Sequence, residues 1–180
     1  MDQEYPVLFE SLDIGPVTLP NRLYQPPYAS GFGLSNLNAK HRAEKAKGGF
    51  GMVCLGATSV HPSSDPSPTE LNSVYNEDSI DRLSTVSNEI QQYGSKAFVE
   101  LTHLGKSTAN RQTKLPPMSS SPIPARAQTY TTGEITPKRM DQDDIDEIVQ
   151  AFGDAAYYAK EGGFDGIEIH AAHGHLISQF

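Results

Sequence analysis

The feature that most constrains the fold of this chain is a repeated alternation between short apolar runs and helices that end in glycine. The apolar runs lie at residues 23–25, 51–57, 97–101 and 166–170, and the helical stretches lie at 39–47, 78–93 and 141–161. Such an order is typical of parallel βαβ units. Doubly wound sheets and (β/α)₈ barrels share this order, and periodicity alone does not separate them.

The helices and the second strand differ in how their apolar residues are spaced. The second and third helices each carry one apolar stripe, as expected for helices that cover a sheet. The stripe of the second helix consists of Ile80, Leu83, Val86 and Ile90, and that of the third consists of Ile145, Ile148, Val149, Phe152, Ala156 and Ala159. The run from Gly51 to Ala57 is continuously apolar, which favours a strand that is buried on both faces.

Two segments fall outside the alternation. Residues 9–22 contain a short alternating piece around Gly15-Pro16, which predicts a small hairpin before the first strand. Residues 105–137 are rich in proline, serine and threonine, which predicts a long loop. Loops of this length in compact domains tend to carry function.

Composition and charge narrow the class of protein. The 180 residues are 37% hydrophobic and carry a net charge of −8, which argues against a nucleic-acid partner. The basic stretch from Lys40 to Lys47 includes Glu44 and is interpreted as a solvated helix face. The single cysteine, Cys54, lies in an apolar run and is expected to be buried and inert. An acidic N-terminus without a long apolar segment predicts no signal peptide, no membrane partner and a cytoplasmic location.

Polar residues gather where the third and fourth apolar runs end. Glu100 and His103 lie at the end of the third run, and His170, His173 and His175 follow the fourth. Active sites of parallel α/β folds form at the carboxyl ends of strands, so Glu100, His103, His170 and His173 are predicted to converge there. Three histidines invite a zinc interpretation, since a spacing of three on a helical turn places two ligands together. No carboxylate or cysteine at a diagnostic spacing accompanies them, so we expect no metal.

Four ordered segments then resemble the Old Yellow Enzyme family of FMN-dependent (β/α)₈-barrel oxidoreductases. The most specific is Phe-Asp-Gly-Ile-Glu-Ile-His-Ala-Ala-His-Gly-His-Leu at 164–176. The other three are Leu-Pro-Asn-Arg at 19–22, Gly-Ala-Thr-Ser-Val-His-Pro at 56–62 and Val-Glu-Leu-Thr-His-Leu-Gly at 99–105. The resemblance covers residues 7–180. It implies a TIM-barrel fold of which this single domain, residues 1–180, holds the first four strands and an N-terminal hairpin.

The resemblance also implies a flavin site. Backbone groups of Pro26, Pro27, Tyr28 and Ala29 would hold the FMN ring, and Ala57 would flank it. Glu100 stands where the family more often has glutamine, and its carboxylate can accept a hydrogen bond from the flavin N3–H but cannot donate one unless protonated. Residues 21–28 look closest to the subgroup that includes 2,4-dienoyl-CoA reductase and trimethylamine dehydrogenase. Alanine at position 29, where a flavin-linking cysteine would stand, implies non-covalent FMN.

His170 and His173 match the pair that binds the substrate oxygen in the family. The implied reaction is reduction of an activated alkene of a small-molecule substrate, with NAD(P)H as hydride donor. His175 stands where many relatives have a proton-donating tyrosine, and histidine can serve as a general acid near neutral pH. Amine dehydrogenation or demethylation is the alternative. It is disfavoured by Ala29, by Ala57 in place of an aromatic wall and by His170 in place of tyrosine.

The resemblance accounts for only half of a barrel. A closed barrel typically needs about 250 residues, and its phosphate groups usually bind after the seventh and eighth strands. A half-barrel exposes two strand edges, which leaves homo-oligomer formation open. A catalytically silent half-barrel that serves as an interaction module is therefore a second hypothesis of another class.

Overall fold

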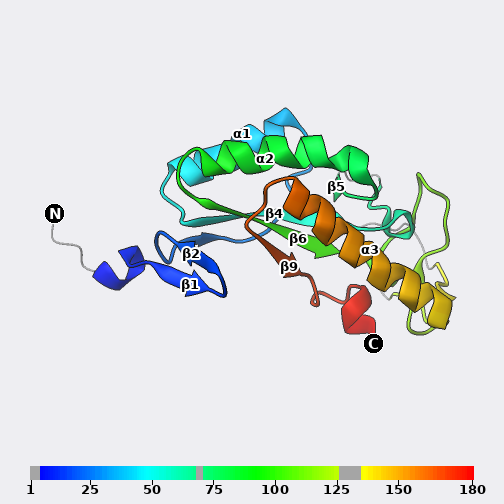
Figure 1. Ribbon diagram of the computed structural model, residues 1–180. Coiled ribbons are helices and arrows are strands. Elements are labelled where there is room, and N and C mark those ends of the chain that lie inside the picture. The colour runs from blue at the N-terminus through cyan, green and yellow to red at the C-terminus, as the bar shows by residue number, and fades with distance from the viewer. Residues whose placement is uncertain (1–4, 68–70, 126–134) are drawn as a thin grey trace.

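The computed structural model describes residues 5–67, 71–125 and 135–180, and its centre is a parallel sheet (Figure 1). The strands β3 (Tyr24–Gln25), β4 (Met52–Ser59), β6 (Lys96–Thr102) and β9 (Gly166–Ile169) follow one another in chain order. Each pairs in parallel with the next, and a short strand β5 (Asn72–Ser73) also pairs with β4. This sequential order is the one expected for the first four strands of the implied barrel, and that expectation is confirmed.

Three helices cover one face of this sheet. They are α1 (Asn36–Lys47), α2 (Ile80–Gln91) and α3 (Gln142–Glu161), and α1 and α2 lie side by side (Figure 1). Val53 and Leu55 of β4 and Val99 of β6 pack with the apolar stripes of these helices in the main core. Because side chains alternate along a strand, Met52, Cys54 and Phe98 point to the other face. That helix-free face is the inner wall of a partial barrel.

The helix ends follow from local capping. Helix α1 begins at Asn36, three residues before the predicted start, because the Ser35 hydroxyl accepts a hydrogen bond from the Asn38 N–H. A 3₁₀ turn, η3 (Glu77–Ser79), leads into α2. Helix α3 opens with a capping box between Asp141 and Asp144, at the predicted position.

The N-terminal hairpin closes the inner face at the start of the strands. After the 3₁₀ turn η1 (Pro6–Phe9), strands β1 (Leu12–Ile14) and β2 (Val17–Leu19) pair antiparallel around Gly15, which adopts the left-handed conformation (φ 57°). Leu19 packs against Met52, Cys54 and Phe98. The predicted hairpin and the buried cysteine are both confirmed.

The predicted long loop is more structured than expected. It contains the 3₁₀ turn η4 (Gly105–Ser107) and strand β7 (Met118–Ser119), which pairs in parallel with β8 (Lys138–Arg139). Asp65, just after the turn η2 (Pro62–Ser64), fixes the middle of the loop. Its Oδ2 accepts hydrogen bonds from the Gln112 N–H (2.6 Å) and the Thr113 N–H (3.0 Å). The part of the loop at 126–134 lies outside the described residues.

The interpretation of residues 40–47 as a solvated face is wrong for Arg42. Its side chain is fully buried, and its guanidinium donates to Gln25 Oε1 (3.0 Å), the Tyr28 carbonyl (2.7 Å) and Asn38 Oδ1 (3.3 Å). The same group lies 4.0 Å from the centre of the Tyr28 ring. Lys40, Glu44 and Lys47 of this stretch are exposed, as expected.

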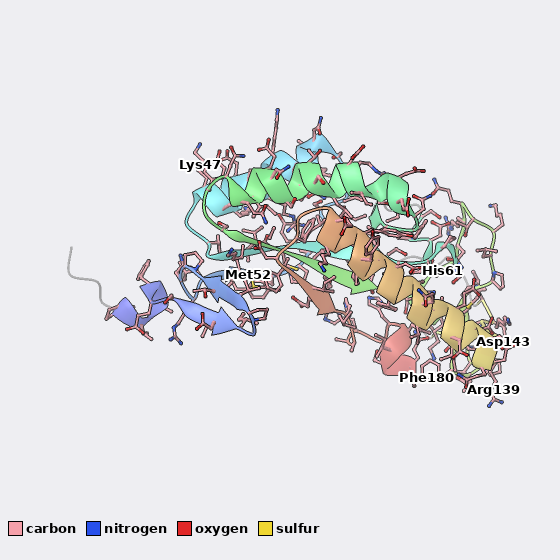
Figure 2. All side chains as sticks on the ribbon, in the orientation of Figure 1. Lys47, Met52, His61, Arg139, Asp143 and Phe180 are labelled. Atoms are coloured by element: carbon pink, nitrogen blue, oxygen red, sulfur yellow. The ribbon has the colours of Figure 1, made fainter. Side chains whose placement is uncertain are left out.

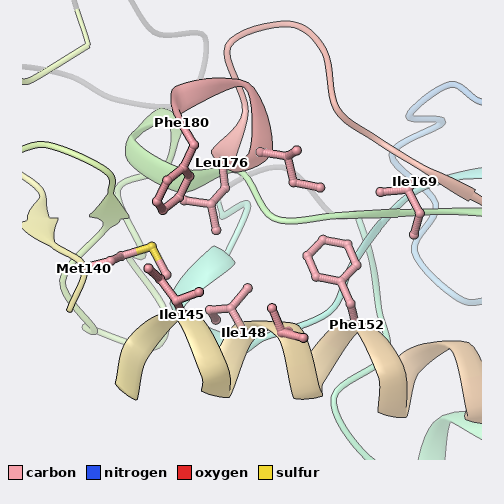
Figure 3. A pocket seen from close by; sticks show the side chains of 9 residues that line it. Met140, Ile145, Ile148, Phe152, Ile169, Leu176 and Phe180 are labelled. Carbon is pink, nitrogen blue, oxygen red and sulfur yellow. The ribbon is translucent and has the colours of Figure 1, made fainter. Parts of the chain in front are cut away.

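One apolar groove remains open beside β9 (Figure 3). It lies between α3 and the C-terminal 3₁₀ turn η5 (Leu176–Gln179), and its lining residues are Met140, Ile145, Ile148, Val149, Phe152, Ile169, Leu176, Ile177 and Phe180. Val149 belongs to the predicted stripe of α3 but is 65% exposed. Among the described residues β9 has a strand partner on one side only. No helix in the described part of the chain combines the length and apolarity that a membrane span needs.

Candidate active site at the carboxyl ends of the strands

A cavity of about 480 Å³ opens on the inner face where β3, β4, β6 and β9 end. Every residue predicted above to bind cofactor or substrate, or to donate a proton, lines this cavity. The lining residues are Pro26, Pro27, Tyr28, Ala29, Ala57, Glu100, Glu168, Ile169, His170, Ala171, Ala172, His173 and His175. A volume of this size is within the range of small-molecule sites.

The segment after β3 forms one wall of the cavity and lies close to β4. Ala29 makes a parallel bridge to Gly56, and a Cβ built on Gly56 would lie 2.3 Å from Pro27 Cβ and 2.9 Å from Glu100 Oε1. Only glycine therefore fits at position 56. The proline pair ends β3, because proline cannot donate to a strand ladder, and the chain turns across the cavity mouth.

The floor of the cavity holds two neighbouring carboxyl groups. Glu100 of β6 and Glu168 of β9 are register partners, so both side chains point to the inner face. Glu168 accepts a hydrogen bond from the Tyr24 hydroxyl (2.5 Å). Burial, together with the nearby Glu168 carboxylate, raises the pKa of Glu100 to about 7. Glu168 was not predicted as a site residue, although its place two residues before His170 on one strand was a usable signal.

This shift predicts a pH-dependent stability. The pKa of Glu100 is about 7 in the folded chain against an ordinary value of 4.5, so folding favours the protonated carboxyl. Unfolding then releases a proton between these values, and stability falls as the pH rises from about 4.5 to about 7. The loss is at most about 3 kcal/mol, from 1.36 kcal/mol per pKa unit. In Glu100→Gln the free energy of unfolding is expected to lose this dependence on pH.

The measurement is a set of urea unfolding curves between pH 4.5 and pH 8 for wild type and Glu100→Gln. The exposed Glu161, at the end of α3, provides a matched control as Glu161→Gln. If Glu100→Gln keeps the wild-type slope, Glu100 does not carry the effect.

His170 is held in one tautomer by the backbone. Its Nδ1 accepts a hydrogen bond from the Ala172 N–H (3.2 Å), so the neutral ring carries its proton on Nε2. That Nε2 lies 3.2 Å from His173 Nδ1 and 3.9 Å from Glu100 Oε2. Burial and the neighbouring His173 lower the pKa of His170, which favours the neutral form. His170 therefore presents an N–H donor at the edge of the cavity.

The segment after β9 folds back on itself and brings His175 to the same place. His173 and Gly174 both adopt left-handed conformations (φ 55° and 70°), and the His175 N–H donates to the Ala172 carbonyl (3.0 Å). The His170 and His175 ring centres lie 4.7 Å apart. Burial, His170 and His173 lower the pKa of His175 to about 4, so at neutral pH it carries a single ring proton.

His103 does not join this group, which corrects the predicted convergence of four residues. It is buried just beyond the end of β6, where its Nε2 lies 2.9 Å from Ser63 Oγ and its Nδ1 accepts from the Gly105 N–H. Ser63 in turn contacts His61 Nδ1 (2.7 Å), and His61 Nε2 lies 3.2 Å from Glu147 of α3. Figure 2 shows His61 near α3. Burial lowers the pKa of His103 to about 3, so the ring is neutral. It ties the loop after β4 to the strand end and has a structural role.

Comparison with known proteins agrees with this geometry. The sequence profile of the family described as NADH:flavin oxidoreductase / NADH oxidase matches residues 7–180. A curated relative, the NADPH dehydrogenase of Clostridium acetobutylicum, is 34% identical over 178 residues, which are 96% of this chain and 50% of the relative. The chain thus spans about half the length of that protein.

Solved structures show the same fold. The 6-hydroxypseudooxynicotine amine oxidase of Pseudomonas geniculata superposes with a TM-score of 0.89 at 33% identity, over 97% of this chain and 26% of that protein. The Old Yellow Enzyme homologue of Zymomonas mobilis superposes with a TM-score of 0.84 at 22% identity, over 95% of this chain and 50% of that protein. This agreement confirms the α/β fold and its likeness to part of a TIM barrel.

Proposed function

Because this chain belongs to the NADH:flavin oxidoreductase / NADH oxidase family, we propose that it forms the N-terminal half of an FMN-dependent barrel enzyme that reduces activated alkenes with hydride from NAD(P)H. The observation that carries the proposal is the convergence in one cavity of the segment 26–29, Ala57 and the imidazoles of His170 and His173. The domain boundaries 1–180 and the site roles are part of the proposal.

The residues around the cavity suit the ring system of FMN. The backbone of 26–29 and the small side chain of Ala57 leave a cavity bordered by main-chain groups. Such groups can form hydrogen bonds with the polar edge of a planar ring. The carboxyl group of Glu100 makes no hydrogen bond to the other described residues and has a raised pKa, so it is able to accept from a ring N–H when ionised and to donate to a ring carbonyl when protonated. When bound, FMN would supply the transfer of hydride between the nicotinamide and the substrate.

His170 and His173 would bind the carbonyl oxygen of an enone or enoyl substrate. Negative charge grows on that oxygen as hydride reaches the β-carbon, and N–H donors fixed in advance stabilise this charge. The Ala172 N–H already holds the His170 proton on Nε2, so no tautomer change is needed for donation. His173 would turn its ring within the exposed, left-handed segment to present its own N–H.

His175 remains the predicted proton donor to the α-carbon. Since its pKa is about 4, only about one molecule in a thousand carries a second ring proton at pH 7. His175 would therefore act as a relay, which gives up its ring proton while it takes one from solvent at the other nitrogen. Because Nδ1 of His175 is buried and has no hydrogen-bond partner among the described residues, this exchange would require the ring to turn.

Amine oxidation is the second candidate, and the similarity to an amine oxidase at 33% identity favours it. Two acidic side chains in the cavity floor, Glu100 and Glu168, would also attract a cationic amine. The residues around the ring argue the other way. Ala57 offers no aromatic face for a cation–π contact, and Ala29 cannot link to the flavin through sulfur.

The proposal concerns a site whose remaining half would come from further βα units. Phosphate groups in such barrels usually bind loops after the last two strands, and the main sheet path described here has four strands. The 180-residue chain alone is therefore expected to hold FMN weakly. Because of its open β9 edge and apolar groove, self-association and a role as a catalytically silent interaction module stay predictions. A cytoplasmic location also stays a prediction.

The test uses a completed enzyme, in which this chain is followed by the second half of a family barrel. It should bind FMN without a covalent bond, because alanine at position 29 has no thiol, and acid precipitation should leave all of the yellow colour in the supernatant. With NADPH or NADH, the completed enzyme should reduce cyclohexenone, while trimethylamine should not reduce its flavin. Colour retained in the pellet would refute the non-covalent site, and turnover of the amine alone would favour the second candidate.

A further inference from the structure

We propose that His170, His173 and His175 form a binding site for one divalent transition-metal cation, with Zn²⁺ as the best match. One ring nitrogen from each of the three lies within 4.8 Å of the other two. Neutral imidazole is a preferred ligand of zinc, and three histidines suffice for a site that keeps a fourth position open. The inference departs from the expectation of no metal drawn from the sequence, and it does not depend on the flavin.

The backbone between the residues creates this arrangement. In a regular helix, residues 170 and 175 would point about 140° apart, since successive side chains turn by about 100°. Here the left-handed His173 and Gly174 reverse the chain, and the ring of His175 returns to contact that of His170. A spacing of three and two residues that fits poorly on a helix thus becomes a cluster in a turn.

The spacing of the first two ligands already suits a metal. His170 Nε2 and His173 Nδ1 lie 3.2 Å apart, and zinc–nitrogen bonds of about 2.0–2.1 Å at a tetrahedral angle require about 3.3 Å. To coordinate through Nε2, His170 would move its ring proton to Nδ1, so no proton is gained or lost overall. The hydrogen bond from the Ala172 N–H would then be given up, and at 3.2 Å it lies at the long end of the range.

The third ligand and a nearby carboxyl group add to the site. The Nδ1 atom of His175 is buried and has no hydrogen-bond partner among the described residues, which is an unusual state for a ring nitrogen. Coordination through Nδ1 would satisfy it. Glu100 Oε2, at 3.9 Å from His170 Nε2, would offset part of the charge of the cation. Because the ligands are those proposed to bind the substrate oxygen, zinc and substrate would exclude each other.

The experiment titrates the metal-free 180-residue chain with Co²⁺, which reports tetrahedral nitrogen ligation through its visible bands, and then displaces it with Zn²⁺. We expect one metal ion per chain. His170→Ala, His173→Asn and His175→Ala should each weaken binding at least about tenfold, the least that is commonly seen when even a hydrogen-bond partner of a metal ligand is removed. Asparagine tolerates the left-handed backbone at position 173, so this variant keeps the fold.

His61→Ala is the matched control, because it removes an imidazole that lines a different pocket. It should bind Co²⁺ like wild type. Equal affinity in wild type and all three variants, absence of the tetrahedral bands, or an equal loss in His61→Ala would each overturn the proposal. None of these results bears on alkene reduction, which is measured with flavin in the completed enzyme, so the two proposals fail separately.

Discussion

Replacing His170 with alanine in the completed enzyme is expected to slow alkene reduction by two to three orders of magnitude. The imidazole presents an N–H donor whose position is set by the Ala172 N–H on the opposite nitrogen. Loss of one such donor to a developing oxyanion commonly costs about 2.7–4 kcal/mol, and each 1.36 kcal/mol is a factor of ten in rate. His173→Ala should have an effect of the same order, since it removes the second donor.

The loss should be confined to the step that needs the oxyanion contact. Oxidation of NADPH with ferricyanide as the electron acceptor involves no substrate carbonyl, so its rate should stay within about threefold of wild type. His170→Asn retains an N–H donor on a shorter side chain and should recover part of the alkene rate. Phenols, which mimic the enolate, should bind more weakly to His170→Ala, as measured by their charge-transfer absorbance.

Two outcomes would contradict the assignment of His170. An alkene rate close to that of wild type in His170→Ala would mean that the residue is structural. An equal fall in the ferricyanide and alkene rates would point to damage at the flavin site instead. His61→Ala serves again as a control, because His61 lies outside the cavity that holds His170.

The succession of strands and helices along the chain was predictable because each apolar run and each helix has a simple period. Val53, Leu55 and Val99 face the helices and Met52, Cys54 and Phe98 face inward, which is the alternation that a strand imposes. The family resemblance supplied what periodicity could not, namely that the sheet curves into a barrel wall. The cavity then brought together all of the residues that the resemblance implied.

The site predictions that were wrong or missing share one physical cause. The identity of a polar residue does not indicate which residue will be its hydrogen-bond partner. His103 follows β6 as closely as His170 follows β9, yet its ring faces Ser63 because the loop after β4 supplies a partner there. Glu168 was not predicted as a site residue, because its place in the cavity depends on its register partner Glu100 and on the Tyr24 hydroxyl. Hydrogen bonds between residues far apart in the chain leave no periodic trace in sequence.

Arg42 is the clearest such case, and its replacement by methionine is expected to destabilise the chain by about 3–5 kcal/mol. Its fully buried guanidinium joins α1 to β3 and to the wall of the cavity, through Gln25 and the Tyr28 carbonyl. Methionine would fill much of the space but would leave three acceptors without a donor, at about 1–3 kcal/mol for each that stays buried. Since a domain is stable by only about 5–15 kcal/mol, this loss is large.

The pattern of losses separates a specific contact from a general effect of charge. Arg42→Lys keeps the positive charge but cannot reach the Gln25 and Tyr28 acceptors with one planar fork, so most of the stability should still be lost. Lys40→Met removes a cation from the exposed face of the same helix and should change stability by less than about 0.5 kcal/mol. Urea unfolding measures all three variants.

Arg42 also contacts the wall proposed to bind flavin, so a milder consequence should be visible before unfolding. The Tyr28 carbonyl that accepts from Arg42 belongs to the segment proposed to hold the FMN ring, and the Tyr28 side chain packs on the guanidinium at 4.0 Å. In the completed enzyme, Arg42→Lys should therefore weaken FMN binding at temperatures where its circular dichroism is still native. If FMN affinity follows only the folded fraction in every variant, the residue supports the fold alone and the wall of the site does not depend on it.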